Sequence, residues 1–181
     1  GTLFDGPGLF RFSGNSTVDG LVIAQRSEIS GGNFGVNPGG EFRVNDSLDW
    51  LGGTLGAGGG VFRVIASASA NLTGPNDKAI SALTLQNDGH VNWTNGNIVT
   101  VSGAVFDNRN TFSILGGNQI SFAGGAPTLL RNTGLIEKLA GPTSTIQLPF
   151  AQDGQLRATG GDLALSGQTI STGAWQAGAG R

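Results

Sequence analysis

The feature of this sequence that most constrains its fold is a repeated turn. Gly89, Asn110, Gly134 and Gly154 each open a short segment in which apolar and polar residues alternate, and they follow one another in steps of 21, 24 and 20 residues. Ser47 lies 42 residues before Gly89, which is two such steps. The turns are repeated more faithfully than the segments between them, so the sequence contains a degenerate repeat of roughly 20–24 residues.

A second turn recurs within each repeat, and the segments between turns are short. These second turns are Gly52-Gly53, Asn95-Gly96, Gly116-Gly117, Gly141-Pro142 and Gly160-Gly161. The segments that alternate as half-buried strands do are 41–44, 61–66, 82–85, 90–93, 97–101, 111–115, 119–122, 135–139, 145–148, 155–158 and 162–165. No stretch of ten or more residues combines helical apolar spacing with an absence of Gly and Pro. The chain is therefore predicted to be all-β.

A period of 20–24 residues suits one coil of a β-solenoid, in which short parallel strands are joined by tight corners and successive coils stack about 4.8 Å apart. Corners need a positive φ or a close approach of two backbones, which Gly supplies and Asn tolerates. We predict a single-stranded, right-handed parallel β-helix of about nine coils. The side chains expected in its interior are Leu83, Leu85, Val91, Phe112, Ile114, Ile120, Phe122, Leu135, Leu156 and Leu163.

The competing all-β interpretation is an antiparallel sandwich with similar turns. The strands are very short for a sandwich, their spacing is regular, and two-residue hairpin turns are few, so the solenoid is favoured. Residues 1–181 are expected to form one solenoid domain, with an irregular cap or looser coils at 1–40, where the period fits worst. The first residue is not Met, and the chain is expected to be a fragment of a longer protein.

The composition excludes several functional classes. Glycine accounts for 33 of 181 residues, charged residues for 12%, and the net charge is −2, which gives no electrostatic reason to expect a nucleic acid partner. The sequence contains no cysteine, so it has neither a disulfide framework nor a thiolate metal site. No apolar run approaches the roughly 18 residues that span a bilayer, and the first residues lack the pattern of a signal peptide.

Three segments resemble a known repeat. Residues 130–138 read LRNTGLIEK, residues 143–146 read TSTI, and residues 161–167 read GDLALSG. They are similar to the F-N-N-T-G-T-L-x-K, T-S-T-I and G-x-L-x-L-x-G segments of tandem repeats in very large bacterial surface and secreted proteins, over roughly residues 83–170. The resemblance implies a β-helical segment of an adhesin-like or autotransporter-like protein. Arg131 replaces the first Asn of the N-N-T-G element, which weakens the expectation of an asparagine ladder at that corner.

Two tryptophans are the candidate binding residues. Trp50 and Trp93 are 43 residues apart, or two coils, so both are expected on one face about 10 Å apart. Aromatic rings at that spacing would suit stacking on a polysaccharide. The other interpretation is that both rings cover the core beside the Gly-rich corners.

The polar residues suggest no strong catalytic or metal site. The acid pairs Asp46 with Asp49 and Asp88 with Asp107 could act on glycosidic bonds, but the turn-capping role of Asp is favoured. His90, the only histidine, is expected to be a solvated strand residue. We therefore expect no catalytic residues, no metal site, no cofactor and no enzymatic activity.

The expected function is structural: a stalk segment of an extracellular or cell-surface bacterial protein that holds a binding region away from the cell. Its expected partners are adjacent repeats of the same chain, host or matrix glycans or proteins, and other copies of itself. The alternatives are a carbohydrate-binding or polysaccharide-cleaving β-helix, and a module that assembles end to end into filaments. A nucleic acid partner and a membrane span within these residues are not expected.

Overall fold

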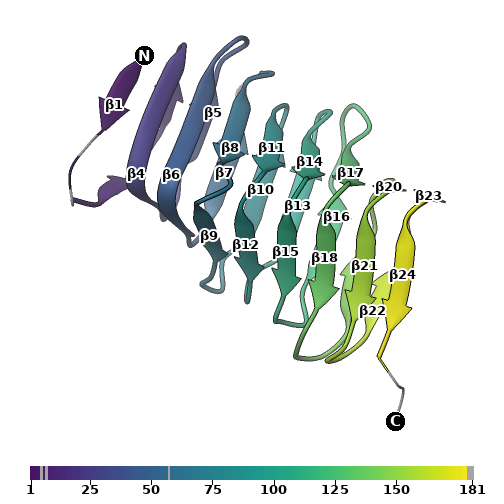
Figure 1. The fold of residues 1–181 in the computed structure, drawn as a ribbon. Helices are drawn as coiled ribbons and strands as arrows, with labels where there is room; N and C mark the ends of the chain where they lie inside the picture. The colour runs from purple at the N-terminus through teal and green to yellow at the C-terminus, as the bar shows by residue number, and fades with distance from the viewer. Residues whose placement is uncertain (5, 7, 57, 179–181) are drawn as a thin grey trace.

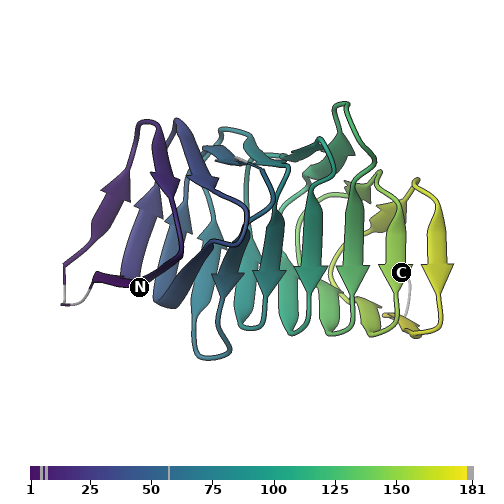
Figure 2. The same cartoon turned by 90° about the horizontal axis from the view of Figure 1, so that it is seen from above.

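The predicted parallel β-solenoid is confirmed. The computed structural model describes residues 1–4, 6, 8–56 and 58–178, and within this part of the chain all regular structure consists of 24 β-strands. Every pairing between these strands is parallel. The strands stack from the N-terminal end to the C-terminal end of an elongated body, so the two chain ends lie at opposite ends of the stack (Figures 1 and 2).

The coils present three faces, because a 16-stranded sheet bends into two faces and an eight-stranded sheet forms the third. Face A consists of β1 (Thr2–Phe4), the first halves of β4 (Leu21–Ile29) and β6 (Glu41–Trp50), β8 (Val61–Val64), β11 (Thr84–Asn87), β14 (Val105–Asn108), β17 (Leu129–Asn132), β20 (Phe150–Gln152) and β23 (Thr169–Ser171). Face B consists of β2 (Phe10–Phe12), the second halves of β4 and β6, β9 (Ser69–Leu72), β12 (His90–Trp93), β15 (Thr111–Ile114), β18 (Leu135–Lys138), β21 (Gln155–Ala158) and β24 (Ala174–Ala177). Face C consists of β3 (Ser16–Val18), β5 (Asn33–Val36), β7 (Gly53–Gly56), β10 (Lys78–Ser81), β13 (Ile98–Val101), β16 (Gln119–Phe122), β19 (Ser144–Ile146) and β22 (Leu163–Leu165).

The described coils number eight rather than about nine, since face C has one strand per coil. The first 40 residues belong to the stack: β1 and β2 pair with β4, and β3 pairs with β5. β1, β2 and β3 have only three residues each. In the next two coils, β4 and β6 run through the corner between faces A and B, with a bulge where Ala24 and Arg26 change register.

The corner between faces A and B explains why glycine recurs in the sequence. From β8 onward the two faces are separate strands, and Gly89, Gly134, Gly154 and Gly173 lie between them. A Cβ atom at any of these four would overlap a main-chain carbonyl of the preceding coil, and none of the four has a positive φ. Close approach of successive coils, rather than a left-handed backbone, therefore requires glycine here.

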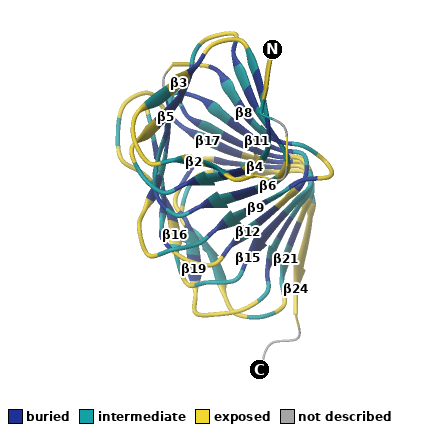
Figure 3. Cartoon of the chain, turned by 90° about the vertical axis from the view of Figure 1, so that its left-hand side faces the viewer, coloured by how far each residue is buried: buried dark blue, intermediate teal, exposed yellow. Residues whose placement is uncertain are grey.

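Apolar side chains fill the space between the three faces. The outward residues of the strands are mostly half-buried, and exposed residues gather in the loops (Figure 3). Phe12, Phe34, Phe42 and Phe62 form a ring cluster in the N-terminal coils, with centroids 4.7–5.9 Å apart. The predicted interior residues that are buried are Leu83, Leu85, Val91, Phe112, Ile114, Ile120 and Leu156. Leu163 is half-buried against this core.

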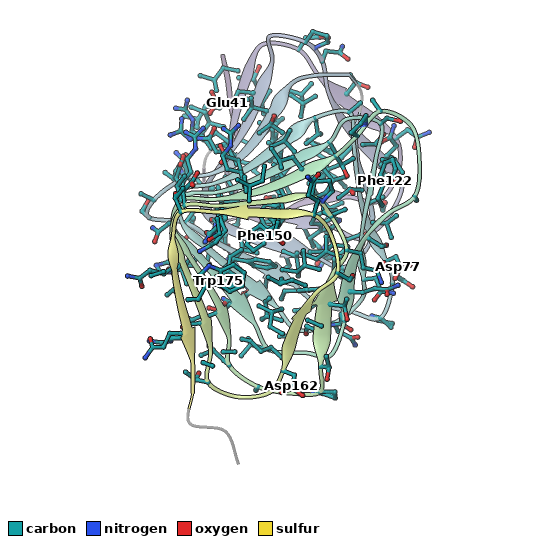
Figure 4. All side chains as sticks on the ribbon, turned by 90° about the vertical axis from the view of Figure 1, so that its right-hand side faces the viewer. Glu41, Asp77, Phe122, Phe150, Asp162 and Trp175 are labelled. Carbon is teal, nitrogen blue, oxygen red and sulfur yellow. The ribbon has the colours of Figure 1, made fainter. Side chains whose placement is uncertain are left out.

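Two predicted interior positions are wrong. Phe122 is 45% exposed, because β16 ends there and the chain leaves into the loop at 123–128, so the ring lies at the outer edge of the coil (Figure 4). In β18, Ile136 and Lys138 face inward and Leu135 is half-buried on the other side. A charged residue ordinarily marks the solvent side of a strand. The inward Lys138 therefore made the opposite side of β18, which carries Leu135, look like the interior side.

Candidate functional site

The largest group of charged side chains lies on the outer side of face A and is called here the charged face. Its members are Glu41, Arg43, Arg63, Gln86, Asp88, Asp107, Arg109 and Arg131. Strand register aligns Arg43, Arg63, Gln86, Asp107 and Arg131 in one column across five coils. Inward residues alternate with them, so the core positions this polar column.

The charged face is a network of paired groups. Arg43 donates from Nε to Oε1 of Glu41 at 3.0 Å, and Arg63 donates from Nε to Oδ2 of Asp88 at 2.5 Å. Gln86 also donates to Oδ2 of Asp88, at 2.8 Å. The hydrogen bond to Glu41 raises the pKa of Arg43 above its usual value, burial opposes this, and the negative charge of Glu41 adds to it. These cations and acids neutralise each other along the sheet.

The two predicted acid pairs do not form catalytic pairs. Asp107 is in register with Gln86 rather than with Asp88, and each of the two aspartates is bound by an arginine: Asp88 by Arg63, and Asp107 by Arg109 at 2.7 Å. The second pair is also divided. Asp46 is exposed at the bulge of β6, and Asp49 accepts a hydrogen bond from Asn71 at 3.1 Å.

Two groups on the charged face, one cation and one carboxylate oxygen, have no partner among the described residues. Arg131 is exposed and makes no ion pair with the described residues. Oδ1 of Asp107, its neighbour in register, is buried and has no hydrogen-bond partner among the described residues. A buried carboxylate oxygen without a partner is costly. Because this oxygen has almost no accessible surface, a ligand that approaches from outside would meet Arg131 rather than Asp107.

The predicted stacking pair of Trp50 and Trp93 belongs to the core. The register of β6, β9 and β12 places Leu72 between them in one column, so they are two coils apart as expected. Both indoles point inward and have no exposed surface. A ring without exposed surface cannot stack on a sugar, so this prediction is wrong. In β6 and β12, the buried residues Leu48 and Val91 stand two positions before Trp50 and Trp93. Strand alternation therefore places each tryptophan on the inward side as well.

The remaining candidates on faces B and A also lie in ordinary surroundings. His90 is exposed at the start of β12, between Ser69 and Thr111 of the neighbouring coils. Among the described residues, no group of three or more His, Cys, Asp or Glu side chains could hold a metal ion.

An open groove of about 540 Å³ follows the corner between faces A and B, and Thr133, Asp153 and Thr172 are among the residues along it. Thr172 donates to Asp153 across this groove at 2.6 Å.

A polar ladder that the sequence analysis missed lies inside this corner. Asn87, Asn108, Asn132 and Gln152 are fully buried and in register, and each of the three asparagines donates to the next amide oxygen at 2.7 Å. The expectation against an asparagine ladder is wrong, because the ladder uses Asn132, the second residue of the family's Asn pair, instead of position 131. The sequence contained the signal: these residues stand two positions before the repeated turn residues.

The interior is open at the C-terminal end of the described stack. Leu156, Leu163, Leu165 and Trp175 contribute to an apolar cavity of about 360 Å³. Trp175 is in register with Leu156 and lies inside the outline of the last coil (Figure 4), yet it is 52% exposed. It is an interior residue that no following coil covers among the described residues.

Comparisons with known proteins identify no relative. No family model matches the chain, and neither the curated proteins nor the solved structures contain a significant match. Within its described residues the structure also has no helix that could cross a membrane.

Proposed function

We propose that this chain is a rigid stalk segment of an extracellular, adhesin-like bacterial protein, and that it holds a binding region away from the cell. The observation that carries the proposal is the unbroken parallel pairing along all three faces, from β1 to β24. Each coil adds about 4.8 Å, so eight coils extend over roughly 35 Å, and length is gained without a new fold. The resemblance of residues 83–170 to bacterial surface repeats supports the extracellular setting.

Features of the surface agree with a supporting role. The acids of the charged face are paired with arginines, and the large aromatic rings Trp50 and Trp93 fill the core. Stiffness comes from hydrogen bonds along the stack, which resist bending because every coil is bound to the next by several strands.

A whole-coil deletion tests the stalk function. Removal of residues 88–108 joins Asn87 to Arg109 and deletes one ladder step in register. A modular stalk should stay folded, with an unchanged β circular dichroism spectrum, and small-angle scattering should show it about 5 Å shorter. The matched control deletes residues 88–98, about half a coil, and should unfold the stack. Equal damage from both deletions would contradict a modular rod.

Glycan recognition is the second candidate, and it is favoured by the exposed guanidinium of Arg131, which makes no ion pair with the described residues. An acidic glycan could bind the guanidinium of Arg131 through its negatively charged group. A glycan array with the wild type, Arg131→Ala and the control Arg157→Ala on face B tests this. Binding lost only in Arg131→Ala would favour recognition; an array with no bound glycan would favour the stalk alone.

A further inference from the structure

We propose that Lys78 and Lys138 act as internal clamps, each joining the main chains of two successive coils at the corner between faces B and C. They are the only two lysines in the sequence, and both are fully buried. Lysine is rarely buried without a carboxylate partner, so two such residues in one small core require an explanation.

The Lys78 clamp connects its own coil to the following one. Its Nζ donates to the carbonyl oxygens of Gly74 at 3.3 Å and Asn76 at 2.9 Å, in the loop between β9 and β10. It also donates to the carbonyl oxygen of Asn95 at 3.0 Å, in the loop between β12 and β13. Three donor hydrogens therefore meet three carbonyl acceptors, which is the full capacity of an ammonium group.

The Lys138 clamp connects its own coil to the preceding one. Its Nζ donates to the carbonyl oxygen of Ala140 at 2.6 Å, in the loop between β18 and β19, and to the carbonyl oxygen of Gly116, in the loop between β15 and β16. The hydroxyl of Ser144 donates to the same Gly116 oxygen at 2.7 Å. Together the two lysines reach four consecutive loops of this corner.

The loops need these donors because their carbonyls turn inward. Outside the strands, no main-chain hydrogen bond in the described part of the chain ends on the oxygens of Gly74, Asn76, Asn95, Gly116 or Ala140. A buried carbonyl without a donor destabilises the fold. Trp93 adds a donor to the loop between β12 and β13, since its Nε1 donates to the carbonyl oxygen of Gly96 at 2.7 Å.

Charge pairing does not account for the two lysines. Asp77 faces Lys78 and Asp162 faces Lys138, but both act at a distance, since neither forms an ion pair with the lysine within the described residues. In Figure 4, Asp77 and Asp162 lie toward the outside of the coils. The contacts of the amino groups are with the main chain, as a clamp requires.

Substitution by methionine tests whether the hydrogen bonds of each lysine stabilise the fold or whether its buried charge only destabilises it. Methionine keeps the bulk of lysine and removes the donors. Lys78→Met and Lys138→Met should each lower the Tm by about 3–6 °C. Arg131→Met removes an exposed cation instead and should leave the Tm within about 1 °C. A Tm that rises in either lysine variant would overturn the proposal.

Hydrogen exchange provides a readout that simple burial would not change. Lys78→Met should speed amide exchange in the following loop at 94–97, and Lys138→Met in the preceding loop at 115–118. Exchange that is faster only near the substituted residue would contradict a link between coils. If a variant does not fold, a measurement on the wild type replaces it. The side-chain NH₃⁺ protons of both lysines should be visible in ¹⁵N-edited spectra at pH 7. Signals lost to fast exchange with water would refute the clamps.

Discussion

At the scale of single residues, the fold depends on polar groups placed inside the stack. Asn108 shows why. The two hydrogens of its Nδ2 are shared among three acceptors: Oδ1 of Asn132 at 2.7 Å and the carbonyl oxygens of Asn110 at 3.1 Å and Leu135 at 3.0 Å. Its Oδ1 accepts from Asn87. One side chain thus joins three coils and the corner between faces A and B. Because these groups are buried, each depends on its neighbours for a partner.

Asn108→Ala should therefore destabilise the chain by about 3 kcal/mol, since it removes the hydrogen bonds that Asn87, Asn132 and Leu135 make with this buried amide. The control is Asn92→Ala, which removes a half-buried outer amide that donates to Asn71 at 3.2 Å and should cost about 0.5 kcal/mol. Urea unfolding followed by circular dichroism measures both. Equal losses in the two variants would show that the inner ladder has no special role.

At the scale of strands and corners, the spacing of coils is set by glycine. A Cβ atom at Gly154 would overlap the carbonyl oxygen of Gly134 in the coil before it. Gly154→Ala should cost about 2 kcal/mol because the two corners must move apart. Gly14 is exposed with open space around it, so Gly14→Ala should stay within about 0.5 kcal/mol of the wild type. The comparison uses urea midpoints, and a tolerated Gly154→Ala would show that the corner can widen.

Strands and corners also show how much of the fold and of the candidate site the sequence could predict. Turn spacing and alternation located most strands of faces B and C from β12 onward, because close contact between corners permits few residue types. On face A they located β6, β8 and β11 but missed β14, β17, β20 and β23. The phase of β18 was hidden because Lys138 occupies an inward position, and the outward Phe122 gave a false apolar signal. Trp50 and Trp93 were ambiguous for a different reason: alternation fixes which residues share a side of a strand, but a large aromatic residue is common both in cores and in binding surfaces. Contacts of main-chain carbonyls leave no pattern in a sequence, so the lysine clamps could not be found there.

At the scale of the whole molecule, alkaline titration acts on very few groups. The sequence contains no tyrosine and no cysteine. Lysine is therefore the side chain that loses its proton at alkaline pH, before the pH at which arginine would do so. Burial lowers the pKa of Lys78 and of Lys138, and the negative charges of Asp77 and Asp162 oppose this less strongly. The folded chain therefore releases these protons at a lower pH than the unfolded chain does.

Stability should consequently rise with pH. Below the lowered folded pKa both states carry the charge; above it the folded state is neutral while the unfolded lysines stay charged up to about pH 10.5. Urea midpoints measured from pH 7 to pH 10 should increase for the wild type and stay flatter for a Lys78→Met/Lys138→Met variant. A wild-type midpoint that falls over this range would mean that the charge itself stabilises the clamps.

Association is a second property of the whole molecule. The last described coil exposes Trp175 and the apolar cavity beside it, together with the unpaired edges of β22, β23 and β24. Such edges and apolar surfaces favour self-association. Light scattering of the 181-residue chain should show an apparent mass that increases with concentration, and Trp175→Glu should reduce that increase. A mass that is constant at all concentrations would contradict association through this end.

The inward position of both lysines also decides how the folded molecule can be handled chemically. Reagents that couple to primary amines, such as succinimidyl dyes, biotin esters and bifunctional crosslinkers, find no lysine on the outer surface. Apart from the α-amino group of the chain, labelling and surface immobilisation of the native rod would have to use arginine, carboxylates or an introduced cysteine. Enzymes that crosslink proteins through lysine would likewise find no accessible lysine side chain on this folded segment.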